Sequence, residues 1–299
     1  TQYELIINLL KKIIMTEKKL FMQENDKILD EWLKAFEQKG GVERNFSLDG
    51  IMFQGNIERE DNTSNSNWVR KESLNYDNEN SSWSENPCRL LILAKDQNVD
   101  GGNSWDSRKT SFRKPNSEVG DYALAGDNFN KRLVFIIYGL AKVLKGEKVP
   151  FEFVDSHRSE ILKFIDSYPF AFANCKKETG EAKCPVDSLQ NAINNYSTFL
   201  DRQIKNIDAD LFICCGSTQA GYSKDHANYS LDFLIKHGYD FKFAGSKYAD
   251  IYYDETHNKI AIDVWHPSYT GVSDKEFYEE AVDTLYDFIN DHKGFLNSH

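Results

Sequence analysis

Four short apolar segments of the chain each end in a residue that can take part in catalysis or binding. A carboxylate can activate water or stabilise a positive charge, and an imidazole can donate a proton or a hydrogen bond. An amide presents one donor edge and one acceptor edge to a ligand. The segments and their terminal residues are 89–94 with Asp96, 170–174 with Asn174, 210–215 with Ser217, and 259–265 with His266.

These apolar segments predict strands buried on both faces of a parallel sheet, because such strands are almost continuously apolar. Helical periodicity is expected over 127–145, 187–207 and 274–292. Alternating strands and helices predict an α/β fold with three layers, α/β/α, around a central, mainly parallel four-stranded sheet. Ligands of such sheets bind beyond the carboxyl ends of the strands, so we expect the four terminal residues to converge there.

The N-terminal part of the chain has a different pattern. Apolar stripes predict helix over 3–39, which Gly40 and Gly41 end, and residues 58–87 are a long polar loop. The sequence therefore predicts two parts: a helical N-terminal extension with a polar loop, 1–87, and an α/β domain, 88–299.

Net charge bears on the class of partner. The chain has a formal net charge of −11, which disfavours nucleic acid, since binding to DNA depends on neutralising phosphates. Basic residues clustered on one face can overcome this. No segment is apolar over the ~18 residues that a membrane helix needs, and no signal peptide is recognisable. We therefore expect a monomer in the cytoplasm with no membrane partner.

Cofactor and metal motifs are not recognised. The five cysteines form no CxxC pair, and His226, His237 and His257 share no metal-ligand spacing, which disfavours a metal-dependent hydrolase. Gly101 and Gly102 lack the further glycine and helix of a phosphate-binding loop. The sequence predicts no metal and no cofactor.

The segments that end in the candidate residues resemble motifs of the uracil-DNA glycosylase superfamily. RLLILAKDQN (89–98) resembles the first motif of this superfamily. FAFANCKK (170–177) resembles its strand that ends in a base-reading asparagine. The last motif is similar to VWHPSYTG (264–271). GDNFNKRL (126–133) resembles the segment that supplies an aromatic ring beneath the flipped base. The similarity spans roughly 89–290.

This resemblance implies a DNA glycosylase that flips a base out of DNA and hydrolyses its N-glycosidic bond. Asp96 would stabilise the sugar cation and orient water, and His266 would donate to the base carbonyl. Asn174 would read the base edge, Phe129 would stack on the ring, and Gln97 and Asn98 would lie near the base. The residues implied to contact DNA are Ser217, Ser268, Tyr269, Lys176, Lys177, Arg113 and Arg132.

Two departures from the family pattern bear on the substrate. The typical uracil enzyme has Pro-Tyr after the carboxylate, and here Gln97 and Asn98 stand instead, without a ring to block a 5-substituent. Residues 99–126 form a long polar segment with Trp105, which we expect to line an enlarged pocket. The sequence therefore favours a modified pyrimidine, such as a hypermodified cytosine of phage DNA, and a role in antiviral defence. A uracil-DNA glycosylase of base-excision repair and a non-catalytic DNA-binding module of the same fold remain alternatives.

Overall fold

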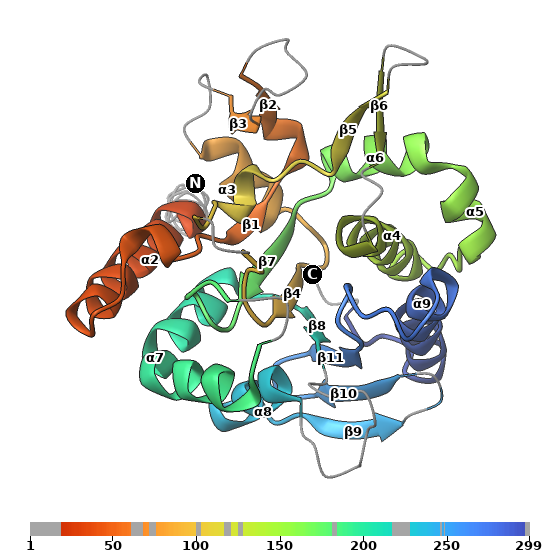
Figure 1. Cartoon of the computed structure of the whole chain (residues 1–299). Coiled ribbons are helices and arrows are strands. Elements are labelled where there is room, and N and C mark those ends of the chain that lie inside the picture. The colour runs from red at the N-terminus through yellow and green to blue at the C-terminus, as the bar shows by residue number, and fades with distance from the viewer. Residues whose placement is uncertain are drawn as a thin grey trace, which may run out of the picture.

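The central feature of the computed structural model is a seven-stranded mixed sheet (Figure 1). The structure describes residues 19–60, 68–71, 76–99, 103–116, 121–124, 128–180, 184–216, 228–245, 247 and 249–296. In spatial order the strands are β1 (Gly50–Met52), β7 (Phe170–Asn174), β4 (Leu90–Ala94), β8 (Leu211–Cys215), β11 (Lys259–Val264), β10 (Asp250–Asp254) and β9 (Lys242–Gly245). The α/β class is confirmed, and the predicted number of four strands is wrong.

The four predicted strands form the parallel part of this sheet. β7 pairs with β4, β4 with β8, and β8 with β11, all in parallel. Their carboxyl ends therefore lie along one edge, as expected. The three additional strands pair antiparallel: β1 on β7, and β10 and β9 beyond β11.

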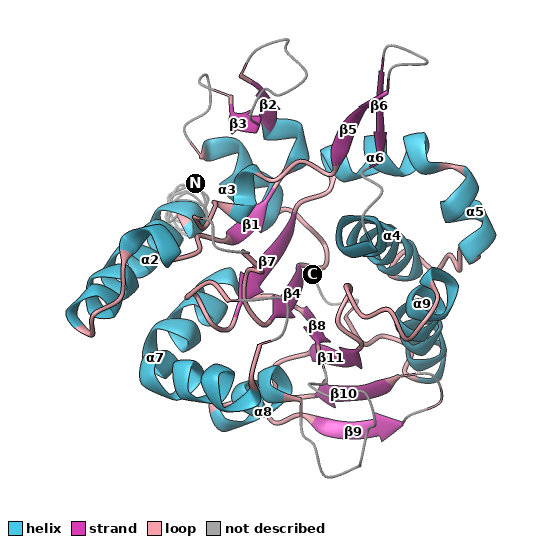
Figure 2. Cartoon of the chain, viewed as in Figure 1, coloured by secondary structure: helices cyan, strands magenta, loops and turns pink. Residues whose placement is uncertain are grey.

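Helices cover both faces of the sheet (Figure 2). Residues of β4 alternate between two cores, with Ile92 in one and Leu91 and Leu93 in the other, because successive side chains of a strand point to opposite faces. On the first face lie α4 (Asn128–Val143), α5 (Phe151–Ser156), α6 (Arg158–Ser167) and α9 (Asp274–Asp291). On the second lie α2 (Phe21–Gln38), α3 (Asp77–Ser84), α7 (Val186–Ile207) and α8 (Tyr229–Lys236).

The described N-terminal residues belong to this same body. β1 pairs with β7, with Ile51 opposite Ala171, and Trp32 of α2 and Trp83 of α3 are buried in the second core. The boundary predicted at residue 87 therefore does not separate two hydrophobic cores. In the described part of the chain, no helix is long and apolar enough to cross a membrane.

The remaining described elements are short and lie outside the main sheet. They are two hairpins, β2 (Ile57–Arg59) with β3 (Trp68–Arg70) and β5 (Arg113–Asn116) with β6 (Asp121–Leu124), and three 3-10 turns, η1 (Glu43–Asn45), η2 (Gln54–Asn56) and η3 (Ser107–Lys109). The segment that precedes β5 contains η3 and connects the end of β4 with this hairpin.

Candidate functional site

A cavity of about 510 Å³ lies at the carboxyl edge of the sheet. Residues from three strand ends meet in it, and this confirms the expected convergence for Asp96, Asn174 and His266. The predicted residues that line it are Asp96, Gln97, Asn98, Trp105, Phe129, Asn174, His266 and Ser268. The others are Met52, Ser107, Thr110, Phe112, Asn128, Asn130, Leu133 and Phe172. Ser217, predicted at the end of β8, lies outside the described residues.

Asp96 is held in place by two neighbours. The Lys176 ammonium donates to Asp96 Oδ2 over 3.2 Å, and both side chains are only 6% exposed. Gly180 is bound to the same loop, since its backbone N–H donates to the Gln97 carbonyl over 2.9 Å. A Cβ on Gly180 would lie 2.2 Å from Asp96 Oδ2, so the Asp96 side chain or the backbone at residue 180 would have to shift. The position of the carboxylate therefore depends on the missing side chain at residue 180.

We expect Gly180→Ala to displace Asp96 and to lower any activity that depends on this carboxylate about tenfold or more, since small misplacements of reacting groups have large effects on rate. The thermal unfolding midpoint should stay close to that of the wild type, because the surrounding backbone is in a loop. Activity and thermal unfolding measured side by side check this. Unchanged activity in Gly180→Ala would show that the position of Asp96 is not critical.

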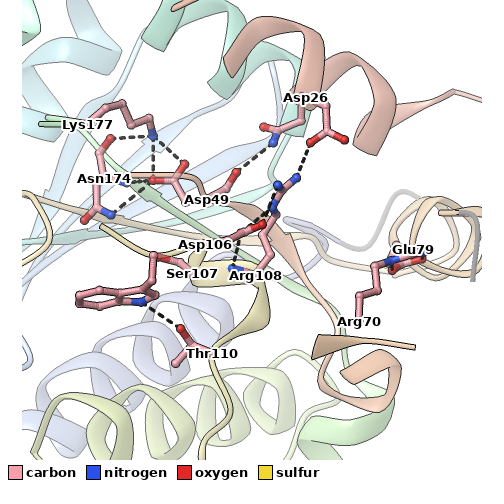
Figure 3. A network of polar contacts seen from close by, with 12 residues as sticks. Asp26, Asp49, Arg70, Glu79, Asp106, Ser107, Arg108, Thr110, Asn174 and Lys177 are labelled. Atoms are coloured by element: carbon pink, nitrogen blue, oxygen red, sulfur yellow. Dashed lines mark hydrogen bonds and ion pairs between the residues drawn. The ribbon is translucent and has the colours of Figure 1, made fainter. Parts of the chain in front are cut away.

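Asn174 ends β7 and is 1% exposed. Its backbone N–H donates to Asp49 Oδ2 over 2.8 Å, and its side-chain nitrogen lies 3.3 Å from the same oxygen (Figure 3). The ammonium of Lys177 donates to both oxygens of Asp49, over 2.6 and 2.8 Å. At the buried end of β7, the ion pair between Asp49 and Lys177 thus lies next to the Asn174 amide, on the side away from the cavity.

His266 follows β11 and is neutral near pH 7. Burial, and then the nearby positive charge of Lys95, lower the pKa of the imidazole to about 4. Its Nδ1 accepts the backbone N–H of Ser268 over 3.2 Å, so the proton of the neutral ring resides on Nε2. The ring of Phe129 has its centroid 5.9 Å from that of His266. The site therefore offers a neutral N–H donor beside an aromatic ring.

Gln97 positions a loop of the cavity. Its amide nitrogen donates to the Trp105 carbonyl over 2.8 Å and to Ser107 Oγ over 3.0 Å, and its oxygen accepts the Trp105 N–H over 3.2 Å. The indole N–H of Trp105 donates to Thr110 Oγ1, and the Trp105 side chain remains 47% exposed. Gln97 was expected near the base; it lines the cavity, and its side-chain amide holds Trp105 there. Asn98 is exposed there.

The four basic residues predicted to contact DNA bind protein groups instead, which corrects that expectation. Lys176 is paired with Asp96, and Lys177 is buried against Asp49. The guanidinium of Arg113 pairs with Asp166. Arg132 is 3% exposed and donates to the carbonyls of Pro267, Tyr269 and Val272, so it stabilises the turn after His266. In each case a buried or partly buried cation has found oxygen acceptors within the fold, as burial requires.

The two remaining DNA-contact predictions lie in the turn that Arg132 holds. Tyr269 stacks on Trp265, with ring centroids 4.7 Å apart, and Ser268 is exposed. Their contact with DNA stays a prediction.

The cysteines beside the site are poor nucleophiles. Burial, and next the charge of Asp96, raise the pKa of the Cys184 thiol to about 11. Burial likewise raises the pKa of Cys214 and Cys215. Because the thiolate is the reactive form, hydrolysis through a cysteine is disfavoured. Among the described residues, no group of three or more His, Cys, Asp or Glu side chains could hold a metal ion.

Sequence reasoning did not find Asp49 and Gly180. Asp49 lies in a short segment before β1, and nothing in its local sequence indicates that it reaches Asn174, 125 residues later. Gly180 resembles any loop glycine. In comparisons with known proteins, no family model matches the chain, and no curated protein is significantly similar to it.

Proposed function

We propose that this chain is a DNA glycosylase of the three-layer α/β/α, uracil-DNA glycosylase-like type that hydrolyses the N-glycosidic bond of a flipped-out modified pyrimidine. The observation that supports this most strongly is the meeting of Asp96, Asn174 and His266 in one cavity at the ends of three parallel strands. Phe129 adds an aromatic ring to the same cavity.

The chemistry of these side chains matches the charges that develop in the reaction. As the glycosidic bond breaks, the sugar gains positive charge and the leaving base gains negative charge. Asp96 stabilises the sugar cation and orients the attacking water, as carboxylates do in glycoside hydrolysis. The neutral imidazole of His266 donates its Nε2 proton as a hydrogen bond to the base carbonyl, where negative charge accumulates. Asn174 pairs with the base edge, and Phe129 stacks on the ring.

The size and rim of the cavity favour a substituted base. Pockets of about 300–1,000 Å³ typically enclose ligands much larger than a bare pyrimidine ring, and this cavity has about 510 Å³. Asn98, which is exposed and lines the cavity, stands where the uracil enzymes carry a blocking ring. We infer a modified pyrimidine as the substrate, with hypermodified cytosine in phage DNA and antiviral defence as the specific hypothesis.

A panel of DNA oligonucleotides tests this function. Each oligonucleotide carries one uracil, thymine, hydroxymethylcytosine or glucosylated hydroxymethylcytosine, and alkali-labile abasic sites are measured after incubation with the full chain. We expect abasic sites with a substituted pyrimidine. Release of uracil alone would replace the proposed substrate with that of a repair enzyme. No abasic site on any member, with binding retained, would identify a non-catalytic DNA-binding module. The ion pair between Asp96 and Lys176 favours this alternative, because it occupies the carboxylate that would act in catalysis.

Trp105 provides a test of how nucleic acid reaches the cavity. Stacking of one base on an aromatic side chain contributes about 1–3 kcal/mol. We therefore expect Trp105→Ala to raise the Kd for the preferred oligonucleotide about tenfold, as measured by fluorescence anisotropy. Trp105→Phe keeps an aromatic ring and should retain most of the affinity. Equal affinity in all three proteins would exclude Trp105 from the binding surface.

A further inference from the structure

The Asn174 side chain can face the cavity in two ways, with its oxygen or with its nitrogen. The two orientations are almost identical in shape and differ in what they demand of a ligand: a donor for the oxygen, an acceptor for the nitrogen. The orientation therefore has to be decided from the groups that contact the amide.

Asp49 decides it. The carboxylate is fully buried, and its oxygens accept from Lys177 Nζ at 2.6 and 2.8 Å, from Gln203 Nε2 at 2.9 Å and from the Asn174 backbone N–H at 2.8 Å. Both oxygens of Asp49 act as hydrogen-bond acceptors, so the side-chain nitrogen of Asn174, which is a donor, must be the atom that faces them. Figure 3 shows Asp49 between the ammonium of Lys177 and the Asn174 amide.

The amide oxygen of Asn174 is thereby left for the ligand. It accepts no hydrogen bond from the described residues. It is also not fully enclosed by protein atoms, so a ligand can reach it. Because Asn174 lines the cavity, this oxygen opens into it.

The N-terminal part of the chain sets the position of Asp49. Asn25 of α2 donates from Nδ2 to the Asp49 carbonyl over 2.9 Å, and its oxygen accepts from Gln203 over 3.1 Å. Gly50 follows with φ +144°, and a Cβ there would lie 2.7 Å from Asn25. The next residues form β1, which pairs with β7. Residues 25–52 thus bring a buried acceptor to the end of the strand that carries Asn174.

We propose that Asp49 is a positioning residue that orients the Asn174 amide, so that the cavity accepts a base whose edge donates a hydrogen bond to Asn174 Oδ1. The inference concerns the specificity of the site and rests on the proposed glycosylase function. It assigns part of the base selectivity to the N-terminal segment, which does not itself supply the group that contacts the base.

The first test needs no substrate. The side-chain amide signals of Asn174, assigned by their loss in Asn174→Asp, are followed by ¹⁵N NMR in the wild type, Asp49→Asn and Gln203→Leu. We expect one amide proton to exchange slowly in the wild type and at least tenfold faster in Asp49→Asn. Gln203→Leu is the matched control, because it removes a contact of Asp49 without touching the Asn174 side chain. Unchanged exchange in Asp49→Asn, or an equal change in both variants, would overturn the proposal.

The second test uses the oligonucleotide panel. In Asp49→Asn, the ratio of kcat/KM for the preferred base to that for the next base should fall about tenfold, and Gln203→Leu should keep the ratio even if it is less stable. An equal loss on all bases in Asp49→Asn would indicate a purely structural role and overturn the proposal. If Asp49→Asn does not fold, Asp49→Asn with Lys177→Met removes both buried charges and is measured in the same way. If no base is released, the NMR result still decides the orientation, independently of the proposed function.

Discussion

Replacing Asp96 with asparagine should lower the single-turnover rate of base release by about 10²–10⁴-fold, the range that one positioned acid–base group typically contributes. The amide has nearly the same shape and can still accept the hydrogen bond of Lys176, so the fold should persist. It carries no negative charge to stabilise the sugar cation, and it cannot take a proton from water. Rapid-quench measurement with enzyme in excess over oligonucleotide separates this chemical step from product release.

Asp30→Asn, on the exposed part of α2, is the matched control for a lost negative charge and should leave the rate unchanged. Binding of the oligonucleotide should be retained in Asp96→Asn, because the lost interaction is made in the transition state. Base release by Asp96→Asn at the wild-type rate would exclude the catalytic role of this carboxylate.

Replacing His266 with phenylalanine should lower the same rate by about 10²–10³-fold, the effect of removing one donor to a developing negative charge. Phenylalanine keeps an aromatic ring, slightly larger than the imidazole, beside Phe129 and removes both ring nitrogens, including the Nδ1 that accepts from Ser268. The reason for a large effect is that the Nε2 proton is the part of the ring left for a ligand, since Nδ1 accepts from Ser268. An equal rate in His266→Phe would assign the imidazole a structural role.

The pH dependence follows from the lowered pKa of His266. With a folded-state pKa of about 4 and a usual value of 6.5, the ring stays neutral in the folded protein down to about pH 4. The pH–rate profile should therefore contain no inflection near pH 6.5 that belongs to His266. Any inflection found there should persist in His266→Phe. As the pH falls from 6.5 towards 4, the unfolded chain takes up a proton that the folded chain does not, so the free energy of unfolding decreases. The fall in melting temperature between pH 7 and pH 5 should be smaller in His266→Phe than in the wild type. An equal fall in the two proteins would contradict the lowered pKa of His266.

The interior of the sheet could be predicted because its strands are uninterrupted apolar segments. Strands β4, β7, β8 and β11 are buried on both faces, and their order with helices indicates parallel pairing. The edge strands lack this pattern. β9 is largely exposed, β10 alternates irregularly, and β1 has only three residues. Their pairing is fixed by contacts with distant segments, which a local pattern does not record.

The candidate site divides in the same way. Asp96, Asn174 and His266 could be predicted to converge, because each follows a parallel strand. The role of Lys177 could not, because whether a lysine faces solvent or a buried carboxylate depends on a partner 128 residues away. The same holds for Arg132, whose acceptors lie in the turn 135–140 residues later. Buried ion pairs between distant segments therefore account for most of the misassigned residues.

The intact mass of the oligonucleotide strand after incubation with the full chain tests the central claim most directly. Hydrolysis of an N-glycosidic bond replaces the base with a hydroxyl group and leaves the backbone whole. We predict a strand lighter by that exchange and one equivalent of free pyrimidine base in solution, with both products formed about 10²–10⁴-fold more slowly by Asp96→Asn. A strand of unchanged mass for every base in the panel, or a cleaved backbone without free base, would contradict the account.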